Sequence, residues 1–120
     1  MPDKIILTGI HLKCRLGVPA EERRTAQEIS VDLELRMELG APGRSDAFAE
    51  TVDYAAVRDV LEEVAARREY HLVESLAESM AHEVLARFPV PEICITVHKP
   101  LALRQFHVDD TAIQIVRRTQ

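Results

Sequence analysis

Tryptophan is absent from this chain of 120 residues, and its only aromatic residues are two tyrosines and three phenylalanines. So few aromatic side chains offer no stacking platform for the bases of a single-stranded nucleic acid. The net charge of −5 also argues against nucleic acid as a partner, because phosphate binding requires clustered lysine and arginine. With only four glycines, the chain has no glycine-rich loop for nucleotide phosphates.

Long apolar runs are missing as well. None approaches the length needed to cross a membrane, and residues 1–4 lead into an alternating segment without the apolar stretch of a signal peptide. The two cysteines, Cys14 and Cys94, do not form a Cys-x-x-Cys motif. We therefore expect a cytoplasmic protein with two free, buried thiols and no contact with a membrane.

Motifs for metal binding and for nucleophilic catalysis are also lacking. The five histidines form no His-x-His or His-x-x-x-His pair, and no cysteine–histidine set has the spacing of a zinc site. No serine lies in a Gly-x-Ser-x-Gly motif. We expect no metal site, since one would require distant histidines to converge in the fold.

The first half of the chain carries two segments with strand periodicity. Apolar and polar residues alternate over residues 5–16, with a change of phase at Thr8 and Gly9 that predicts a β-bulge. The clearest alternation covers residues 28–39, where one face is apolar and the other carries charges of both signs. We expect residues 40–43, with two glycines and a proline, to end this strand.

Two segments with helical periodicity follow. Apolar residues recur at helical spacing over residues 57–64, and Asp53 or Thr51 is a suitable N-cap. A second apolar stripe covers residues 72–88 and stops at Pro89, which cannot continue a helix. We interpret both stripes as core-facing.

Residues 93–98 and 112–116 complete the pattern as two further strands. We therefore predict a single domain over residues 1–120, of the α+β class, with an antiparallel sheet in β-β-α-α-β-β order. Two helices can cover only one face of such a sheet, and its two edges remain open. Closure of several copies into a larger β-barrel would pair those edges, so we expect a homo-oligomer.

Four polar residues flank these elements where a small molecule could bind. Tyr54 falls at the start of the first helix, Lys99 follows a strand, and Glu22 lies in an early loop. Glu74 opens the second helix, where free backbone N–H groups meet the carboxylate and where the edge of a cyclic amidine or guanidine could bind. Taken singly, each also has a simpler interpretation as a packed tyrosine, a helix-start acid or a solvated surface charge.

Taken together, the order and spacing of these segments resemble dihydroneopterin aldolase and its relative, dihydroneopterin triphosphate 2′-epimerase. The resemblance extends over nearly the whole chain. The matching segments are Ile10-His11-Leu12, Leu16-Gly17-Val18, Glu22, Gln27 to Asp32, Thr51-Val52-Asp53-Tyr54, Leu72 to Ala77, and Lys99-Pro100.

This resemblance implies the tunnelling fold (T-fold), in which four subunits close a sixteen-stranded barrel and two such rings commonly stack into an octamer. We therefore expect a homo-octamer or a tetramer, with active sites between neighbouring subunits. It also implies a small-molecule pterin substrate and no cofactor. The implied substrate-binding residues are Glu74, Val73, Asp53 and Val52, and the implied catalytic residues are Lys99, Tyr54 and Glu22.

The implied activity is that of a lyase of folate biosynthesis. It would cleave 7,8-dihydroneopterin by a retro-aldol reaction into 6-hydroxymethyl-7,8-dihydropterin and glycolaldehyde. Two alternatives remain at this point: a 2′-epimerase of dihydroneopterin or its triphosphate, and a non-catalytic oligomer that binds pterins or purines. The segment Ala102-Leu103-Arg104 after the lysine resembles the epimerase branch. Glu21 competes with Glu22 for the acidic position, and the spacing from Gly17 and Gln27 favours Glu22.

Overall fold

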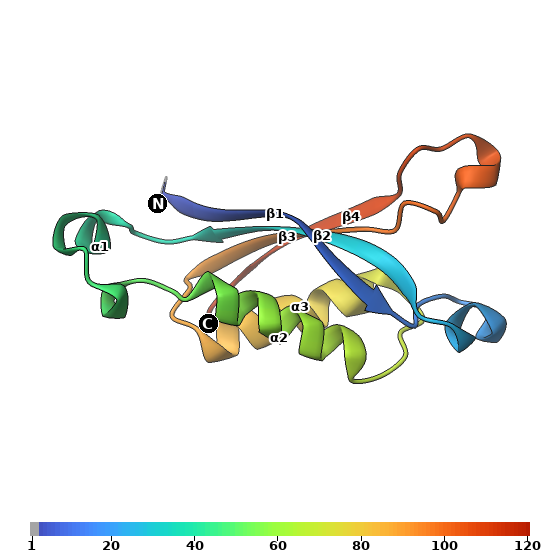
Figure 1. Cartoon of the computed structure of the whole chain (residues 1–120), viewed down its shortest axis with the longest axis horizontal. Coiled ribbons are helices and arrows are strands. Elements are labelled where there is room, and N and C mark those ends of the chain that lie inside the picture. The colour runs from blue at the N-terminus through green and yellow to red at the C-terminus, as the bar shows by residue number, and fades with distance from the viewer. Residues whose placement is uncertain (1–2) are drawn as a thin grey trace.

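A computed structural model describes residues 3–120 as one antiparallel sheet with two helices on one of its faces (Figure 1). The strands lie in the order β1-β2-β3-β4, so neighbours in the chain are also neighbours in the sheet. The predicted β-β-α-α-β-β order is confirmed. The strands are β1 (Lys4–Cys14), β2 (Gln27–Arg36), β3 (Glu92–His98) and β4 (Ala112–Arg118).

The β-bulge predicted in the first strand is present at Gly9. The register between β1 and β2 shifts between Leu7 and Ile10, and Gly9 has a φ of +70°. A positive φ suits glycine, which has no Cβ to clash with its own backbone. The Gly9 N–H, freed from the ladder, donates to Asp32 Oδ1 at 2.7 Å. The bulge therefore ties β1 to a carboxylate on β2.

The second strand is shorter than its alternation suggested, and the residues expected to end it lie beyond its last residue. β2 ends at Arg36, and residues 40–43 lie within a short helix, α1 (Gly40–Ser45). Pro42 lies in the first turn of α1, where the N–H that proline lacks would have no partner within the helix. Asp46 ends α1 in the left-handed conformation, with its N–H on the Pro42 carbonyl.

The two main helices begin and end close to the expected positions. They are α2 (Tyr54–Ala66) and α3 (Val73–Arg87). The carboxylate of Asp53 caps α2 by accepting from the N–H groups of Ala55 and Ala56, so Asp53 rather than Thr51 is the N-cap.

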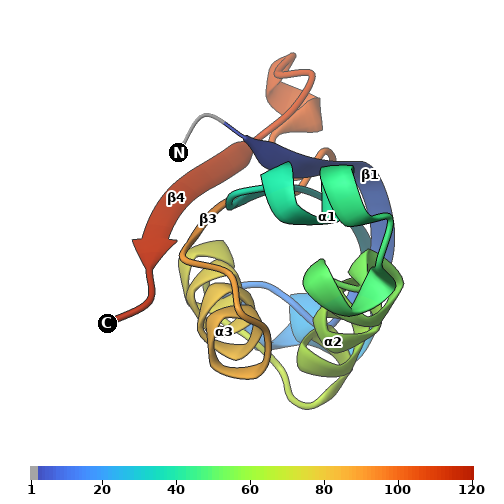
Figure 2. The same cartoon turned by 90° about the vertical axis from the view of Figure 1, so that its left-hand side faces the viewer.

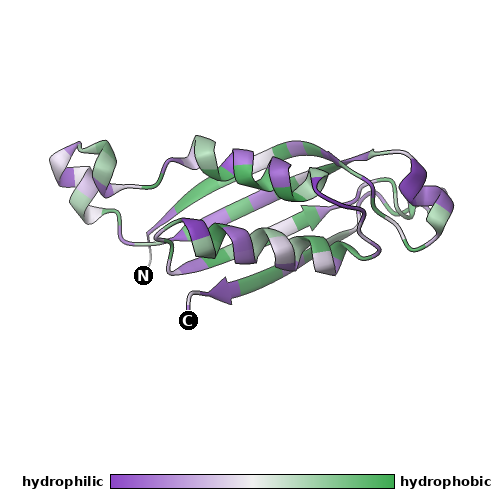
Figure 3. Cartoon of the chain, turned by 90° about the horizontal axis from the view of Figure 1, so that it is seen from below, coloured by the Kyte–Doolittle hydropathy of each residue, from purple (hydrophilic) through white to green (hydrophobic). Residues whose placement is uncertain are grey.

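Both helices bury their apolar stripes against the same face of the sheet, which curves over them (Figure 2). Seen from the helical side, polar residues lie along the outer surfaces of α2 and α3 (Figure 3). The buried residues that join the layers include Leu12, Ile29, Val31, Leu33, Leu35, Val57, Leu61, Leu76, Met80, Val84, Ile93 and Ile95. The opposite face of the sheet, which the single chain leaves uncovered, carries ion pairs such as Arg36–Glu92 and Lys4–Glu34.

Both cysteines are buried and free, as expected. Burial raises the pKa of the Cys14 thiol to about 11, which keeps the thiol protonated and unreactive. Among the described residues, no helix is both long enough and apolar enough to cross a membrane.

Candidate active site

The centre of the candidate site is an ion pair between Lys99 and Glu22. Lys99 directly follows β3, and Glu22 lies in a short 3-10 helix, η1 (Ala20–Arg24), between β1 and β2. Lys99 Nζ lies 2.6 Å from Glu22 Oε2. The lysine side chain is only 13% exposed, whereas that of Glu22 is 35% exposed. The pair is therefore accessible from one side while its cation is held against the protein.

The Glu22 carboxylate is held by a second hydrogen-bond donor. Gln27 Nε2 donates to Glu22 Oε2 at 3.2 Å. The hydrogen bond from Lys99, supported by that from Gln27, holds the pKa of the Glu22 carboxyl below its usual range. Glu21, the competing acid, is exposed. The geometry thus selects Glu22 as the partner of Lys99.

The loop that carries Glu22 is attached to the segment that leads into α3. The Gly17 N–H donates to the Tyr70 carbonyl at 3.0 Å, and the Tyr70 N–H donates to the Arg15 carbonyl at 2.9 Å. Arg23 donates to the carbonyls of Gly17 and Val18. The buried Tyr70 thereby links the Glu22 loop to the residues just before Glu74.

Glu74 lies exposed in the first turn of α3, as predicted. Leu72 is the N-cap residue and makes no side-chain cap, so the first backbone N–H groups of α3 remain available to a ligand. Among the described residues, the structure records no ion pair or hydrogen bond to the Glu74 carboxylate. A carboxylate beside free N–H groups can accept from a donor pair while the N–H groups bind an adjacent carbonyl oxygen.

The remaining predicted residues, Val52, Asp53 and Tyr54, lie at the other end of the elongated molecule. Tyr54 and the two residues before it lie at the start of α2, near α1, whereas η1, the start of α3 and the end of β3 lie at the opposite end of the long molecule (Figure 1). Tyr54 is 59% exposed, Val52 is buried, and the Asp53 carboxylate is occupied by its cap. One chain therefore places the elements that carry Glu22, Lys99, Val73 and Glu74 at one end of the molecule and the start of α2, with Val52, Asp53 and Tyr54, at the other.

Two polar features near Lys99 were not assigned to the site from the sequence. Gln27 was noted only as part of a matching segment and as a reference for spacing, and its contact with Glu22 required the β1–β2 connection to be known. On the uncovered face of the sheet, His98 contacts both Asp32 and Asp110. Alternation places His98 and Lys99 on opposite sides of the strand end, but no spacing rule could have indicated that Asp110 folds back to His98.

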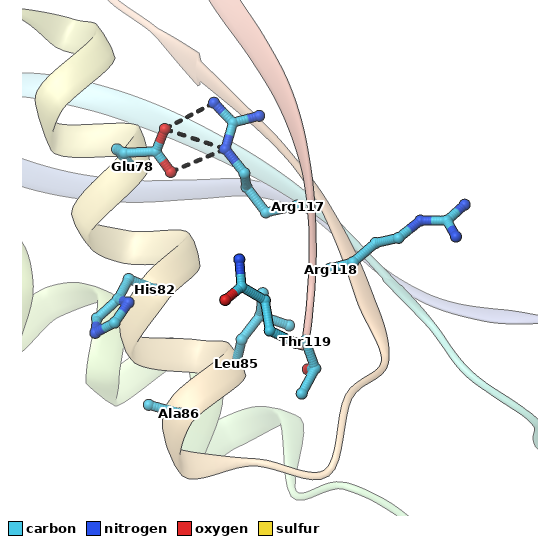
Figure 4. A pocket seen from close by; sticks show the side chains of 8 residues that line it. Glu78, His82, Leu85, Ala86, Arg117, Arg118 and Thr119 are labelled. Atoms are coloured by element: carbon cyan, nitrogen blue, oxygen red, sulfur yellow. Dashed lines mark hydrogen bonds and ion pairs between the residues drawn. The ribbon is translucent and has the colours of Figure 1, made fainter.

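A hollow on another part of the surface is a weaker candidate for the active site. It measures about 390 Å³ and lies between α3 and the end of β4, where Glu78 accepts hydrogen bonds from Arg117 (Figure 4). His82 and Leu85 also line it. Because its one acid is already paired with an arginine, this hollow lacks the available carboxylate and N–H groups found at Glu74.

The fold and the site together define a class of protein. It is a T-fold protein whose candidate small-molecule site comprises a helix N-terminus, a strand-end lysine and a loop glutamate. Residues 5–116 match the profile of the FolB dihydroneopterin aldolase family. The chain belongs to this family.

Individual proteins of known name or structure are similar to this chain over nearly its whole length. The chain is 39% identical to a dihydroneopterin aldolase of Methylorubrum extorquens, covering 98% of this chain and 91% of that protein. A FolB crystal structure from Vibrio cholerae superposes with a TM-score of 0.91 at 31% identity, over 97% of each chain. The E. coli dihydroneopterin aldolase in complex with neopterin has a TM-score of 0.89 at 25% identity, over 96% of this chain and 98% of that one.

Proposed function

We propose that this protein is a dihydroneopterin aldolase, which cleaves 7,8-dihydroneopterin into 6-hydroxymethyl-7,8-dihydropterin and glycolaldehyde. The observation that carries the proposal is the 2.6 Å Lys99–Glu22 pair at the same end of the molecule as the unpaired Glu74, in a chain of this family. The pair supplies proton-transfer groups, and Glu74 supplies a ring anchor. The two buried free thiols suit a cytoplasmic enzyme.

Glu74 holds the amino-pyrimidinone edge of the pterin. Its carboxylate accepts from the ring N–H and the exocyclic amino group, a charge-assisted contact at two points. The N–H groups at the start of α3, near Val73, bind the adjacent carbonyl oxygen. These contacts do not change during the reaction, so they bind and orient the substrate but do not lower the barrier of the chemical step.

Lys99, Glu22 and Tyr54 act at the trihydroxypropyl side chain. Cleavage removes the proton of the 2′-hydroxyl, converts C2′ into the aldehyde carbon of glycolaldehyde and breaks the C1′–C2′ bond. The electron pair of that bond passes into the conjugated imine of the dihydropterin ring, and C1′ then takes up a proton to give the hydroxymethyl product. Lys99 stabilises the developing charge near the ring nitrogen, and Glu22 positions Lys99 and the hydroxyl groups.

Tyr54 reaches this chemistry only from a second subunit. The start of α2, which carries Tyr54, lies at the opposite end of the molecule from the end of β3, which precedes Lys99, and the sheet has open edges at β1 and β4. Pairing of these edges closes a ring of four subunits, and two rings form an octamer. Tyr54, Asp53 and Val52 of the partner subunit then complete each site, with Tyr54 returning the proton to C1′ and the backbone near Val52 and Asp53 contacting the pterin.

The second candidate function is epimerisation at C2′ of dihydroneopterin or its triphosphate. It is favoured by a hollow of about 530 Å³ in the loop after Lys99, which Arg104 and His107 line together with Asp109. Two basic side chains there could receive a phosphorylated tail. An epimerase shares the retro-aldol step, but the glycolaldehyde fragment adds back from its other face instead of leaving.

One assay distinguishes these functions. The protein is incubated separately with 7,8-dihydroneopterin and with its triphosphate, and glycolaldehyde and the 2′-epimer are followed over time. Stoichiometric glycolaldehyde from the unphosphorylated substrate supports the aldolase. Epimer without glycolaldehyde supports the epimerase, and binding of the pterin without turnover supports a non-catalytic pterin-binding oligomer.

A further inference from the structure

His98 lies on the uncovered face of the sheet, between two carboxylates from different parts of the chain. Its Nε2 is 2.8 Å from Asp32 Oδ2 on β2, and its Nδ1 is 2.6 Å from Asp110 Oδ2, just before β4. The other oxygen of Asp32 accepts the N–H of Gly9 at the β-bulge. The imidazole thus joins β1, β2 and the segment before β4 through side-chain contacts.

Only the doubly protonated imidazole satisfies both contacts. A neutral imidazole has one N–H, so one of its nitrogens would present a lone pair to a carboxylate oxygen. The hydrogen bond with Asp110, followed by that with Asp32, raises the pKa of His98 above its usual range. The Gly9 N–H and His98 together lower the pKa of the Asp32 carboxyl. Below the pKa of His98, the cluster is therefore an imidazolium between two carboxylates.

This cluster closes the base of the loop that begins with Lys99. Asp110 is the residue before Thr111, whose carbonyl accepts the Lys99 N–H at 2.7 Å. His98 and Lys99 are adjacent, so the carboxylate contacts on one face of the strand end and the Lys99–Glu22 pair on the other constrain the same stretch of backbone. Without the Asp110 contact, the loop base is held by the Lys99–Thr111 backbone hydrogen bond and by the pairing of His98 with Ala112 across β3 and β4, with no side-chain contact from the segment before β4 to His98.

We propose that His98 is a positioning residue, which in its protonated form clamps Asp32 to Asp110 and thereby holds Lys99 in place for the reaction. His98 contacts no substrate and transfers no proton to it. Because the clamp requires the imidazolium, it is complete below the pKa of His98 and is lost as the pH rises through it. The groups that face the imidazole in the described part of the chain are Asp32 on β2 and Asp110 before β4.

The kinetic test rests on the proposed aldolase function and uses two variants. In the wild type, kcat should fall roughly tenfold as pH rises through the His98 pKa, less than the roughly hundredfold that a 1 Å misplacement can cost. His98→Gln should show the lower kcat at every pH, with KM changed less than twofold. His98→Arg, a cation that does not titrate and has several donors, should retain the higher kcat without this pH step. His11→Gln is the matched control, because His11 pairs with one carboxylate, Glu28, on the same face.

An NMR titration tests the clamp without relying on turnover. The ring proton of His98 should titrate above the usual histidine range in the wild type, and Asp110→Asn should lower that pKa. The Nζ signal of Lys99 should shift in step with the His98 titration, and this step should be absent in His98→Arg. A His98 pKa at or below the usual range, or a Lys99 signal indifferent to it, would overturn the proposal. Inactivity of the wild type with an intact clamp would refute only the aldolase function.

Discussion

The carboxylate of Glu22 occupies the space that a Cβ on Gly17 would fill. Gly17 also has a φ of +156°. A side chain at this position would therefore displace the glutamate that pairs with Lys99. This close approach gives a physical reason why a glycine lies five residues before the glutamate.

Gly17→Ala should impair the site and cost some stability. The new methyl group displaces Glu22, so we expect kcat to fall at least tenfold and the free energy of unfolding to fall by about 1–3 kcal/mol. Gly43→Ala is the control, since nothing lies within 4 Å of its added Cβ and it lies in α1. Urea unfolding and steady-state kinetics measure the two effects. Wild-type activity in Gly17→Ala would show that the Glu22 position is not needed.

Glu74→Ala should abolish pterin binding while the fold is retained. Truncating one side of a charge-assisted pair leaves the ligand donors unpaired, which typically costs about 2–5 kcal/mol. Calorimetric titration with 6-hydroxymethyl-7,8-dihydropterin measures this loss. Glu78→Ala provides the comparison, because Glu78 lies one turn further along α3 and pairs with Arg117 instead. Equal affinity in both variants would mean that Glu74 is only a helix-start acid.

Lys99→Ala and Tyr54→Phe should lower kcat far more than they weaken product binding. These side chains act where charge develops and protons move, so their contacts strengthen mainly in the transition state. Single-turnover kinetics measures the rate of the cleavage step, and separate titrations with the product measure its affinity. Near-normal cleavage by both variants would leave only a pterin-binding role for the site. Tyr54→Phe removes one exposed hydroxyl, so its packing should be unaffected.

Mixing these two inactive variants should restore activity, because Lys99 follows β3 and Tyr54 begins α2, and these two element ends lie at opposite ends of the molecule (Figure 1). After dissociation and reassembly in equal amounts, random pairing gives about one quarter of sites with both native residues. Activity near that fraction of the wild type is expected, and sedimentation should show a tetramer or octamer. A monomer at micromolar concentration, or no recovery in the mixed assembly, would contradict a site shared between subunits.

The Lys99–Glu22 pair should be insensitive to mild acid. The pKa of Glu22 is lowered in the folded protein, so the pair stabilises the fold above the unfolded pKa and loses this contribution as pH falls through the folded pKa. Since Glu22 is partly exposed, the effect should be only about 0.2–1 kcal/mol. Urea unfolding of the wild type and Glu22→Gln should differ at pH 7 and converge in strong acid. Glu21→Gln, which alters the exposed neighbour, should follow the wild type throughout.

Much of the fold could be predicted from local sequence. The alternation in β2, the phase change at Gly9 and the apolar stripes of α2 and α3 each follow from the geometry of a strand or helix. The family resemblance also identified Glu22, Lys99 and Glu74 as candidates before any contact was known. The short helix α1 was not predicted, because glycine and proline suit a strand-ending loop as well as the first turn of a helix.

The sequence alone determined the element order, the core-facing residues, the family resemblance and the candidate residues, since periodicity and spacing are properties of the chain itself. Only the tertiary structure decided which candidates meet. It paired Lys99 with Glu22 at 2.6 Å, placed Tyr54 at the far end, and folded Asp110 back onto His98. These relationships depend on strand order and loop closure, which bring together residues separated by up to 77 positions, beyond the reach of any local pattern.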